Sequence, residues 1–414
     1  MRWPTGSFQS CRLRSANHQQ RCAPWSALIP SEIPSELPSA LSGDPASARS
    51  WCERLRAGTP DAQLLLLLGG TQTAEVAGIS AAGATAASRR LTAAADAELL
   101  LRGPGPGRCH ALPPLPAGVS PALISHVVRR ELALETLVVD LGCPVMPAVP
   151  HLRLGQLPAR CLSTGAAMAP ERVSRLVQLG ESWARGWARR PGQPPLVLAE
   201  CVPGGTSTAQ AVLSGLGIEA AGLVSGSLRQ PAHALKASLV EKGLRAAELW
   251  RLPSGEPVDP LRVVAAVGDP MQPLAAGLVL AAAAAEIPVL LAGGSQMAAV
   301  LALALALAPD DLRPGLVAGT ALVTTAWVAG EPGSDLSLLL QRIGSRWRVE
   351  PIAFATGLRF HGCRSRGLRD YERGYVKEGV GAGGLALLWE LSGRRLAQLS
   401  EACDLACEQL EGCA

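Results

Sequence analysis

Short aliphatic runs that end in glycine or a small polar residue recur along the chain from residue 64 onward. Most of these runs are separated by about 10 to 15 residues of helical character. Strand, glycine turn and helix in repetition is the pattern of a doubly wound α/β fold, in which helices flank both faces of a mostly parallel sheet. The expected strands lie at residues 64–70, 137–142, 195–200, 221–227, 262–269, 287–294 and 316–324.

The composition suits such a sheet. Hydrophobic residues make up 48% of the chain but aromatic residues only 3%, so the core must be built from alanine, leucine and valine. These residues pack well between helices and a buried parallel sheet. A formal net charge of +4 over 414 residues is too small to indicate a nucleic-acid surface. We therefore expect small-molecule ligands and no nucleic acid.

The chain divides into four expected parts. Residues 1–60 are rich in proline, serine, arginine and glutamine, which predicts a disordered leader with at most a short helix that ends at Arg56. We expect the fold to survive removal of residues 1 to about 55. Proline and glycine cluster near residues 102–118 and 187–195, as in loops or module joints. We expect an N-terminal module at 61–190, the main parallel-sheet module at 191–350, and a C-terminal cap at 351–414 that returns to the site. The terminal segments should form a smaller helical module.

The sequence indicates a soluble protein of a reducing compartment. Its most apolar stretch, residues 297–308, is shorter than the roughly 20 residues that a membrane-spanning helix needs. The N-terminus does not have the pattern of a secretory signal. None of the eleven cysteines falls in a CxxC pair, which favours buried thiols over a disulfide or metal framework. We expect a cytoplasmic protein without a metal site.

The most informative turn is ECVPGGTSTA, where a strand ends at Glu200 and a helix begins near Thr206. Gly204, Gly205 and the hydroxyls of Thr206 and Thr208 place donors at a helix N-terminus, which is a seat for an anion. The turn lacks the Gly-Lys-Ser/Thr ending of a P-loop, so a single phosphate is favoured over a nucleoside triphosphate. The alternative is an ordinary threonine-capped helix after a tight turn.

Two later turns are further candidates for nucleotide binding. In AVGDPMQP, Gly268 and Asp269 are expected to end a strand and Met271 to begin a helix, so Asp269 either binds a ribose hydroxyl or caps that helix. In LAGGSQ, Gly293 and Gly294 again separate an expected strand from a helix.

A small-residue loop, GISAAGA, follows the first expected strand. Gly78, Ser80 and Gly83 in this loop would allow a ligand to approach the backbone closely. The alternative is a loop that is tight only because of packing.

Near the C-terminus, Glu378 precedes four glycines in six residues, Gly379, Gly381, Gly383 and Gly384. A partly buried carboxyl group has a raised pKa and can act as a general base near neutral pH. The alternative is an acid that faces solvent beside Lys377.

Four of these segments together resemble the nicotinate-nucleotide:dimethylbenzimidazole phosphoribosyltransferase family, and more closely the branch of it found in cyanobacteria and archaea. They are GISAAGA, ECVPGGTSTA, VVAAVGDPMQPLAAG through IPVLLAGG, and YVKEGVGAGG. The resemblance covers roughly residues 61–390. It departs from the family at two turns, where Lys377 replaces a usual glycine and Val-Pro-Gly-Gly replaces glycine-asparagine-threonine.

The resemblance implies a role for each segment. Glu378 would be the catalytic base, Glu200 and the turn at 204–208 would hold the phosphate, and Lys236 on a following helix would accompany them. The GISAAGA loop would belong to the pocket for the acceptor base.

The implied reaction is phosphoribosyl transfer from nicotinate mononucleotide to a base, giving an alpha-ribotide and nicotinate, in cobamide lower-ligand assembly. Dimethylbenzimidazole, adenine and other azoles all stay open as the acceptor. No cofactor is expected, and the resemblance suggests a homodimer. Two alternatives remain: a noncatalytic protein of the same fold that binds a nucleotide or corrinoid, and a Rossmann-type oxidoreductase, although the chain lacks a clean GxGxxG.

Overall fold

The computed structural model describes residues 39–155, 157–250 and 258–412. These residues form one eight-stranded sheet in the order β1-β8-β7-β6-β5-β2-β3-β4, which is parallel except where β1 pairs antiparallel with β8. The predicted α/β class is therefore confirmed. The strands are β1 (Ser39–Ser42), β2 (Gln63–Leu68), β3 (Glu135–Asp140), β4 (Leu152–Arg153), β5 (Leu196–Cys201), β6 (Val289–Ala292), β7 (Thr320–Thr325) and β8 (Ile352–Thr356).

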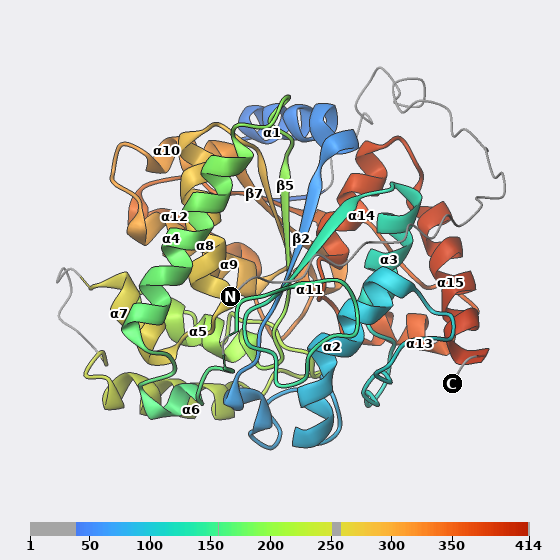
Figure 1. Cartoon of the computed structure of the whole chain (residues 1–414), viewed down its shortest axis with the longest axis horizontal. Helices are drawn as coiled ribbons and strands as arrows, with labels where there is room; N and C mark the ends of the chain where they lie inside the picture. Colours follow the sequence, from blue (N-terminus) through green and yellow to red (C-terminus); the bar gives the residue numbers. More distant parts are fainter. Residues whose placement is uncertain (1–38, 156, 251–257, 413–414) are drawn as a thin grey trace, which may run out of the picture.

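Helices cover both faces of the sheet (Figure 1). One face carries α1 (Pro45–Gly58), α2 (Ala86–Arg102), α3 (Ala122–Glu131), α14 (Ala382–Leu391) and α15 (Leu396–Gly412). The other carries α4 (Pro170–Trp187), α5 (Gly205–Gly215), α6 (His233–Ala246), α7 (Pro260–Val267), α8 (Met271–Ala284), α9 (Ser295–Leu307), α10 (Arg313–Gly319) and α12 (Leu336–Trp347). Two short helices, α11 (Ala326–Ala329) and α13 (Arg366–Arg369), lie in connections.

Alternate residues of each central strand enter different cores. In β2, Leu64, Leu66 and Leu68 pack under one helical layer, whereas Leu65 and Leu67 pack under the other. A strand that is buried on both faces needs no polar alternation, which explains why these strands read as continuous aliphatic runs.

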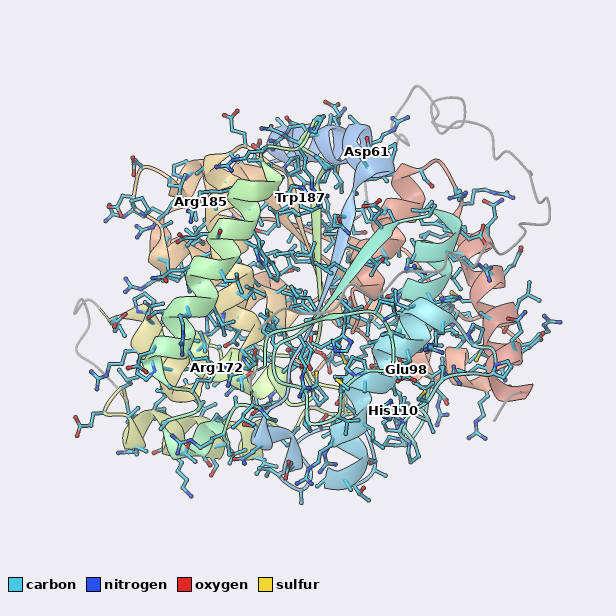
Figure 2. The ribbon with its side chains drawn as sticks, viewed as in Figure 1. Asp61, Glu98, His110, Arg172, Arg185 and Trp187 are labelled. Atoms are coloured by element: carbon cyan, nitrogen blue, oxygen red, sulfur yellow. The ribbon has the colours of Figure 1, made fainter. Side chains whose placement is uncertain are left out.

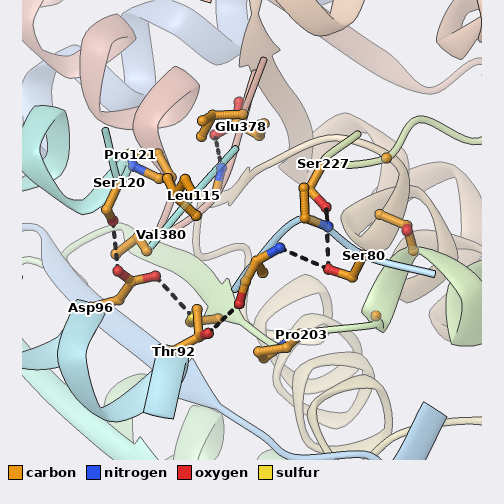
Figure 3. A pocket seen from close by; sticks show the side chains of 18 of the residues that line it. Ser80, Thr92, Asp96, Leu115, Ser120, Pro121, Pro203, Ser227, Glu378 and Val380 are labelled. Atoms are coloured by element: carbon orange, nitrogen blue, oxygen red, sulfur yellow. Dashed lines mark hydrogen bonds between the residues drawn. The ribbon is translucent and has the colours of Figure 1, made fainter. Parts of the chain in front are cut away.

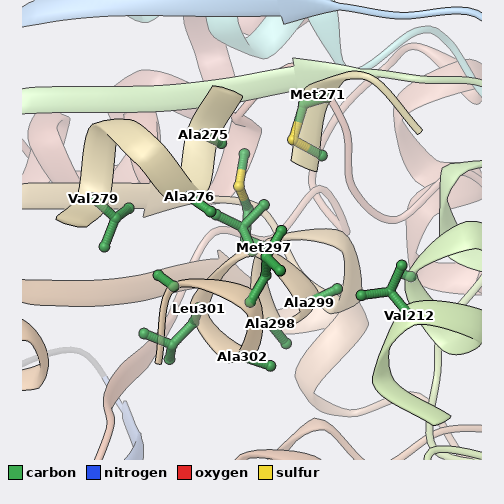
Figure 4. Close-up of a cluster of buried hydrophobic side chains, with 14 of the residues drawn as sticks. Val212, Met271, Ala275, Ala276, Val279, Met297, Ala298, Ala299, Leu301 and Ala302 are labelled. Carbon is green, nitrogen blue, oxygen red and sulfur yellow. The ribbon is translucent and has the colours of Figure 1, made fainter. Parts of the chain in front are cut away.

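Small residues let the helices of the second layer approach one another closely. Figure 4 shows Val212 of α5 facing Ala299 of α9, and Ala276 of α8 next to Met297 of α9. Between α4 and α8 the backbones touch, because a Cβ atom on Gly180 would lie 2.2 Å from the Leu274 carbonyl oxygen. The alanine-rich and glycine-containing composition is thus a packing requirement of this layer.

Two expected strands are wrong. Residues 221–227 form a loop, and residues 262–269 belong largely to helix α7. Asp259 caps that helix by accepting a hydrogen bond from the Leu261 N–H, and Pro260 occupies its first turn, which is a helix-start signal. The helix is buried, so its apolar run imitates a strand. The run at 316–324 is split between α10 and β7.

The predicted leader is also wrong for residues 39–60, which form β1 and α1. Ala48, Trp51, Cys52 and Leu55 are buried at helical spacing, and the Trp51 ring stacks on Phe354 at 6.0 Å between centroids. Four apolar residues on one face suffice to dock this helix, of which the possible short helix ending at Arg56 was the only sign in the sequence. The rest of the predicted leader, residues 1–38, lies outside the described residues.

The three expected modules all contribute to the same sheet. Strands β2 to β4 come from residues 61–190, β5 to β7 from 191–350, and β8 from 351–414. The terminal helices α1, α14 and α15 join α2 and α3 on one face (Figure 1). The boundaries near 190 and 350 therefore do not separate independent sheets.

Candidate active site

The order of the strands locates a cavity. Beyond β2 the sheet continues outward through β3 and β4 on one side, and through β5 to β8 on the other. In sheets of this type, ligands bind beyond the carboxyl ends of the strands where the order reverses. A cavity of about 260 Å³ lies there (Figure 3). It is lined by segments that follow β2, β5 and β6, by most of residues 112–121, and by residues 375, 376 and 378–380.

Glu378 lies at the cavity, in the turn that precedes helix α14, and is partly buried. One carboxyl oxygen accepts hydrogen bonds from the Thr324 hydroxyl at 3.1 Å and the Thr325 N–H at 2.9 Å. The other accepts from the N–H groups of Gly379 at 3.0 Å and Gly383 at 3.2 Å. Burial outweighs these four bonds and raises the pKa of Glu378 to about 7. The carboxyl group can therefore exchange a proton near neutral pH.

The glycines after Glu378 bring α14 against the sheet. A Cβ atom on Gly383 would lie 2.3 Å from the Thr324 carbonyl carbon, and one on Gly384 would lie 2.4 Å from the Ala292 Cβ. The turn itself holds Val376, Lys377 and Val380 at positive φ values, which side chains other than glycine seldom adopt. The glycine run is thus needed for the close approach that places Glu378.

Lys377 points away from the cavity. Its Nζ atom donates to a Glu331 carboxylate oxygen at 2.7 Å and to the Leu228 carbonyl oxygen at 2.7 Å, with both charged side chains almost fully buried. The alternative of an acid that faces solvent beside Lys377 is wrong, because the lysine is buried and Glu378 faces the cavity.

Glu200, at the end of β5, is the second acid of the cavity. Its carboxylate accepts from the Val202 N–H at 2.8 Å and from the Gln296 side-chain amide at 2.8 Å. Burial, with the negative charges of Asp269 and Glu378 nearby, raises the pKa of Glu200 to about 8. Two acids with raised pKa values on one cavity are typical of sites that move protons.

Two helix N-termini lie at the cavity. Helix α5 begins after Gly204, which has φ +80°, and α9 begins after Gly294; neither has a side-chain cap. Gly205 and Thr206 line the cavity in the first turn of α5. Backbone N–H groups and the helix dipoles make such a pair of ends a seat for an anion.

Lys236 is buried one layer behind this seat. Its ammonium group donates to the Ser225 carbonyl oxygen at 2.6 Å, and Ser225, Gly226 and Ser227 line the cavity. Burial lowers the pKa of Lys236 to about 8. Lys236 itself is not among the lining residues.

The structure does not bring every expected residue to the cavity. Thr208 donates to an Asp269 carboxylate oxygen at 2.5 Å, and Asp269 accepts from the N–H of Met271, the first residue of α8. Both side chains are fully buried. Of the GISAAGA loop, only Ser80 and the two alanines after it line the cavity. The expected residues away from its lining are Gly78, Gly83, Thr208, Lys236, Gly268, Asp269 and Gly293.

A proline-rich wall of the cavity escaped the sequence analysis. Residues 112–121 form it, together with Thr92 and Asp96 from α2. Glu98 anchors the preceding loop by accepting hydrogen bonds from the backbone N–H groups of Cys109 and His110, and Figure 2 shows Glu98 beside His110. The sequence signal was a pair of acids inside an apolar helix, which periodicity alone marks only as buried.

Among the described residues, no group of three or more histidine, cysteine, aspartate or glutamate side chains is arranged to hold a metal ion. In the same part of the chain, no helix has the length and apolar character to cross a membrane.

Comparison with known proteins first defines a class. A family model described as Phosphoribosyltransferase matches residues 122–320. The solved structure of CobT from Thermus thermophilus shares the fold, with a TM-score of 0.51 and 20% identity over 89% of this chain and 98% of that chain. A structure of a nicotinate-nucleotide-dimethylbenzimidazole phosphoribosyltransferase from the same organism has a TM-score of 0.50 and 20% identity, over 90% of this chain and 99% of that chain. The resemblance inferred from the sequence motifs is thereby confirmed.

Closer relatives then define the family. The UPF0284 protein of Prochlorococcus marinus (strain MIT 9313) is 53% identical over 377 residues, which cover 89% of this chain and 91% of the relative. The UPF0284 protein of Gloeobacter violaceus is 45% identical over 87% of this chain and 91% of the relative. The chain belongs to the UPF0284 family.

Proposed function

We propose that this protein transfers the 5-phosphoribosyl group of nicotinate mononucleotide to a ring nitrogen of an acceptor base, giving an alpha-ribotide and nicotinate for cobamide lower-ligand assembly. The observation that carries the proposal is the cavity at the reversal of strand order, where a carboxyl group with a pKa of about 7 adjoins two uncapped helix N-termini. The match to a phosphoribosyltransferase family supports it.

The phosphate is assigned to the N-termini of α5 and α9. The Gly205 and Ser207 N–H groups already donate to the Val202 and Gly204 carbonyl oxygens, so the remaining N–H groups of the two first turns and the helix dipoles supply the attraction. Lys236 contributes positive charge from behind Ser225. No lysine, arginine or histidine is among the described residues that line the cavity.

The chemical step forms one bond and breaks another at the anomeric carbon. The acceptor nitrogen attacks that carbon, and the bond to nicotinate breaks with its electron pair going to the pyridine nitrogen, which becomes neutral. The proton of the acceptor N–H passes to Glu378 as positive charge develops on the acceptor ring. Binding of the phosphate at α5 and α9 aligns the sugar for this attack.

Protonation of Glu378 requires one of the four groups that donate hydrogen bonds to its carboxylate to stop donating. Three of them are backbone N–H groups that the fold fixes, whereas the Thr324 hydroxyl can rotate. Thr324 would turn from donor to acceptor when Glu378 takes the proton.

The proposal also includes a homodimer that acts in the cytoplasm on small molecules without a metal or other cofactor.

A noncatalytic binding protein of the same fold is the second candidate. It is favoured by the same four hydrogen bonds, which fill all the acceptor positions of the Glu378 carboxylate. The two candidates differ in turnover.

We expect purified protein, incubated with nicotinate mononucleotide and a panel of azole and purine bases, to release nicotinate and form a ribotide with at least one base. Tight nucleotide binding with no release for any base would instead support the binding protein.

A further inference from the structure

We propose that the cavity wall formed by Thr92, Asp96 and Ser120 recognises an N–H or amino donor on the acceptor base, so that the preferred acceptors carry a second hydrogen-bond donor. This inference rests on the proposed function and narrows its substrate class. Thr92 and Asp96 come from α2, and Ser120 comes from the proline-rich wall.

The side-chain hydroxyl and thiol hydrogens on this wall already donate hydrogen bonds within the protein. The Ser120 hydroxyl donates to Asp96 at 2.6 Å, and the Thr92 hydroxyl donates to the Ala82 carbonyl oxygen at 2.6 Å. The Cys201 thiol donates weakly to the other Asp96 oxygen at 3.4 Å. Figure 3 shows these bonds on one wall of the cavity. What the side chains offer a ligand is therefore oxygen lone pairs alone.

Asp96 has acceptor capacity left over. An ionised carboxylate has about four lone-pair positions, and the two donors above use two of them. Among the described residues, none forms an ion pair with Asp96, although it is only 5% exposed. Burial raises the pKa of Asp96 to about 6, so it is mostly ionised at neutral pH. A buried carboxylate of this kind favours a ligand that brings a donor.

The wall also has the right neighbours for a flat ring. Leu112, Pro113, Leu115 and Pro116 give it an apolar surface. Its end adjoins the Glu378 turn, because a Cβ atom on Gly379 would lie 2.9 Å from Cγ of Pro121. A planar base in this slot can present its reacting N–H to Glu378 and a second donor to Asp96.

The test uses pairs of benzimidazoles that differ only at one ring carbon, where one compound carries an amino group and the other a methyl group. One such pair is compared for each substitutable ring carbon. The two substituents have nearly the same size, but only the amino group donates. Binding of each base to the wild-type protein is measured by calorimetry, and nicotinate release is measured with nicotinate mononucleotide present. At the best position we expect the amino compound to bind about tenfold or more tightly, and to react with a correspondingly higher kcat/KM.

Asp96→Leu should bring the two affinities to within about twofold, whereas Asp404→Asn, at a buried carboxylate outside the cavity, should preserve the preference. Equal or tighter binding of the methyl compounds by the wild-type protein overturns the inference, whether or not the leucine variant folds. A preference that survives in Asp96→Leu also overturns it. An amino preference in binding without nicotinate release for any base would contradict the proposed transfer and leave the recognition of a donor intact.

Discussion

Glu378 shows how a single residue can be recognised from a motif while its surroundings cannot. The motif KEGVGAGG pointed to Glu378, and ECVPGGTSTA pointed to Glu200; both line the cavity. Asp269 was equally prominent in the sequence, but its carboxylate bonds to the first turn of α8 and to Thr208, because the same residue types bind helix N-termini and ligands. The sequence marked Asp96 only as an acid inside an apolar helix, since its partner Ser120 is brought to it by the fold.

Thr324→Val should move the acidic limb of the pH-rate profile to higher pH. The carboxylate of Glu378, the form that accepts a proton, is lost as the pH falls through about 7, so turnover should fall with it. The Thr324 hydroxyl stabilises that carboxylate, and its removal should raise the pKa of Glu378 by about half a unit to one unit. Thr324→Ser retains the hydroxyl and should keep the wild-type profile. An unchanged limb in the valine variant would show that this bond does not tune Glu378.

At the scale of elements, most strands were predicted correctly from the sequence, but a buried helix was mistaken for a strand. The runs at β2, β3, β5 and β6 were correctly assigned because they are short and end in turn residues. The run that became α7 has the same composition, and only the Asp259-Pro260 start signal distinguishes it. Packing of α14 onto β6 and β7 was not visible, although its glycines were.

Gly383→Ala should destabilise the protein by about 1–3 kcal/mol, because the added methyl group would meet the backbone of Thr324. Urea denaturation measures this loss. Gly315→Ala in α10 is the matched control, since a Cβ there meets nothing within 4 Å and should be neutral or slightly stabilising. Equal stability of the two variants would mean that α14 is not pressed against β7.

Lys377→Met should lower the free energy of unfolding by about 3–5 kcal/mol. Methionine is similar in length to lysine, but it leaves Glu331 as a buried charge without its ion-pair partner. Arg245→Met provides the control: its pair with Glu241 is exposed on α6 and should contribute less than about 1 kcal/mol. A loss in the Lys377 variant no larger than in the control would contradict a structural role for the buried pair.

At the scale of the whole molecule, the class of fold was predictable and the extent of the sheet was not. Alternating strands and helices fixed the α/β class, but the pairing of β1 with β8 joins residues about 310 positions apart, for example Ser39 and Ala355. Local patterns carry no information on such a pairing. The expected modules therefore merged into one sheet, and the last part of the expected leader became its edge.

Trp51→Ala tests that edge. Trp51 is fully buried, and its indole N–H donates to the Gly319 carbonyl oxygen at 3.2 Å. Its truncation should cost about 3–5 kcal/mol of unfolding free energy, and deletion of residues 1–58 should cost more. Thermal unfolding followed by circular dichroism measures both. A wild-type melting temperature after the deletion would restore the original expectation of a dispensable leader.

The most direct test of the proposed transfer is Glu378→Gln, assayed for nicotinate release and, separately, for binding of nicotinate mononucleotide. Glutamine keeps the size of the side chain but cannot accept the proton, so base-dependent release should fall about 100- to 10,000-fold. Affinity for the nucleotide should stay nearly unchanged, because its phosphate is assigned to the N-termini of α5 and α9. Wild-type turnover in this variant would contradict the account and would leave Glu378 as a residue that only holds α14 in place.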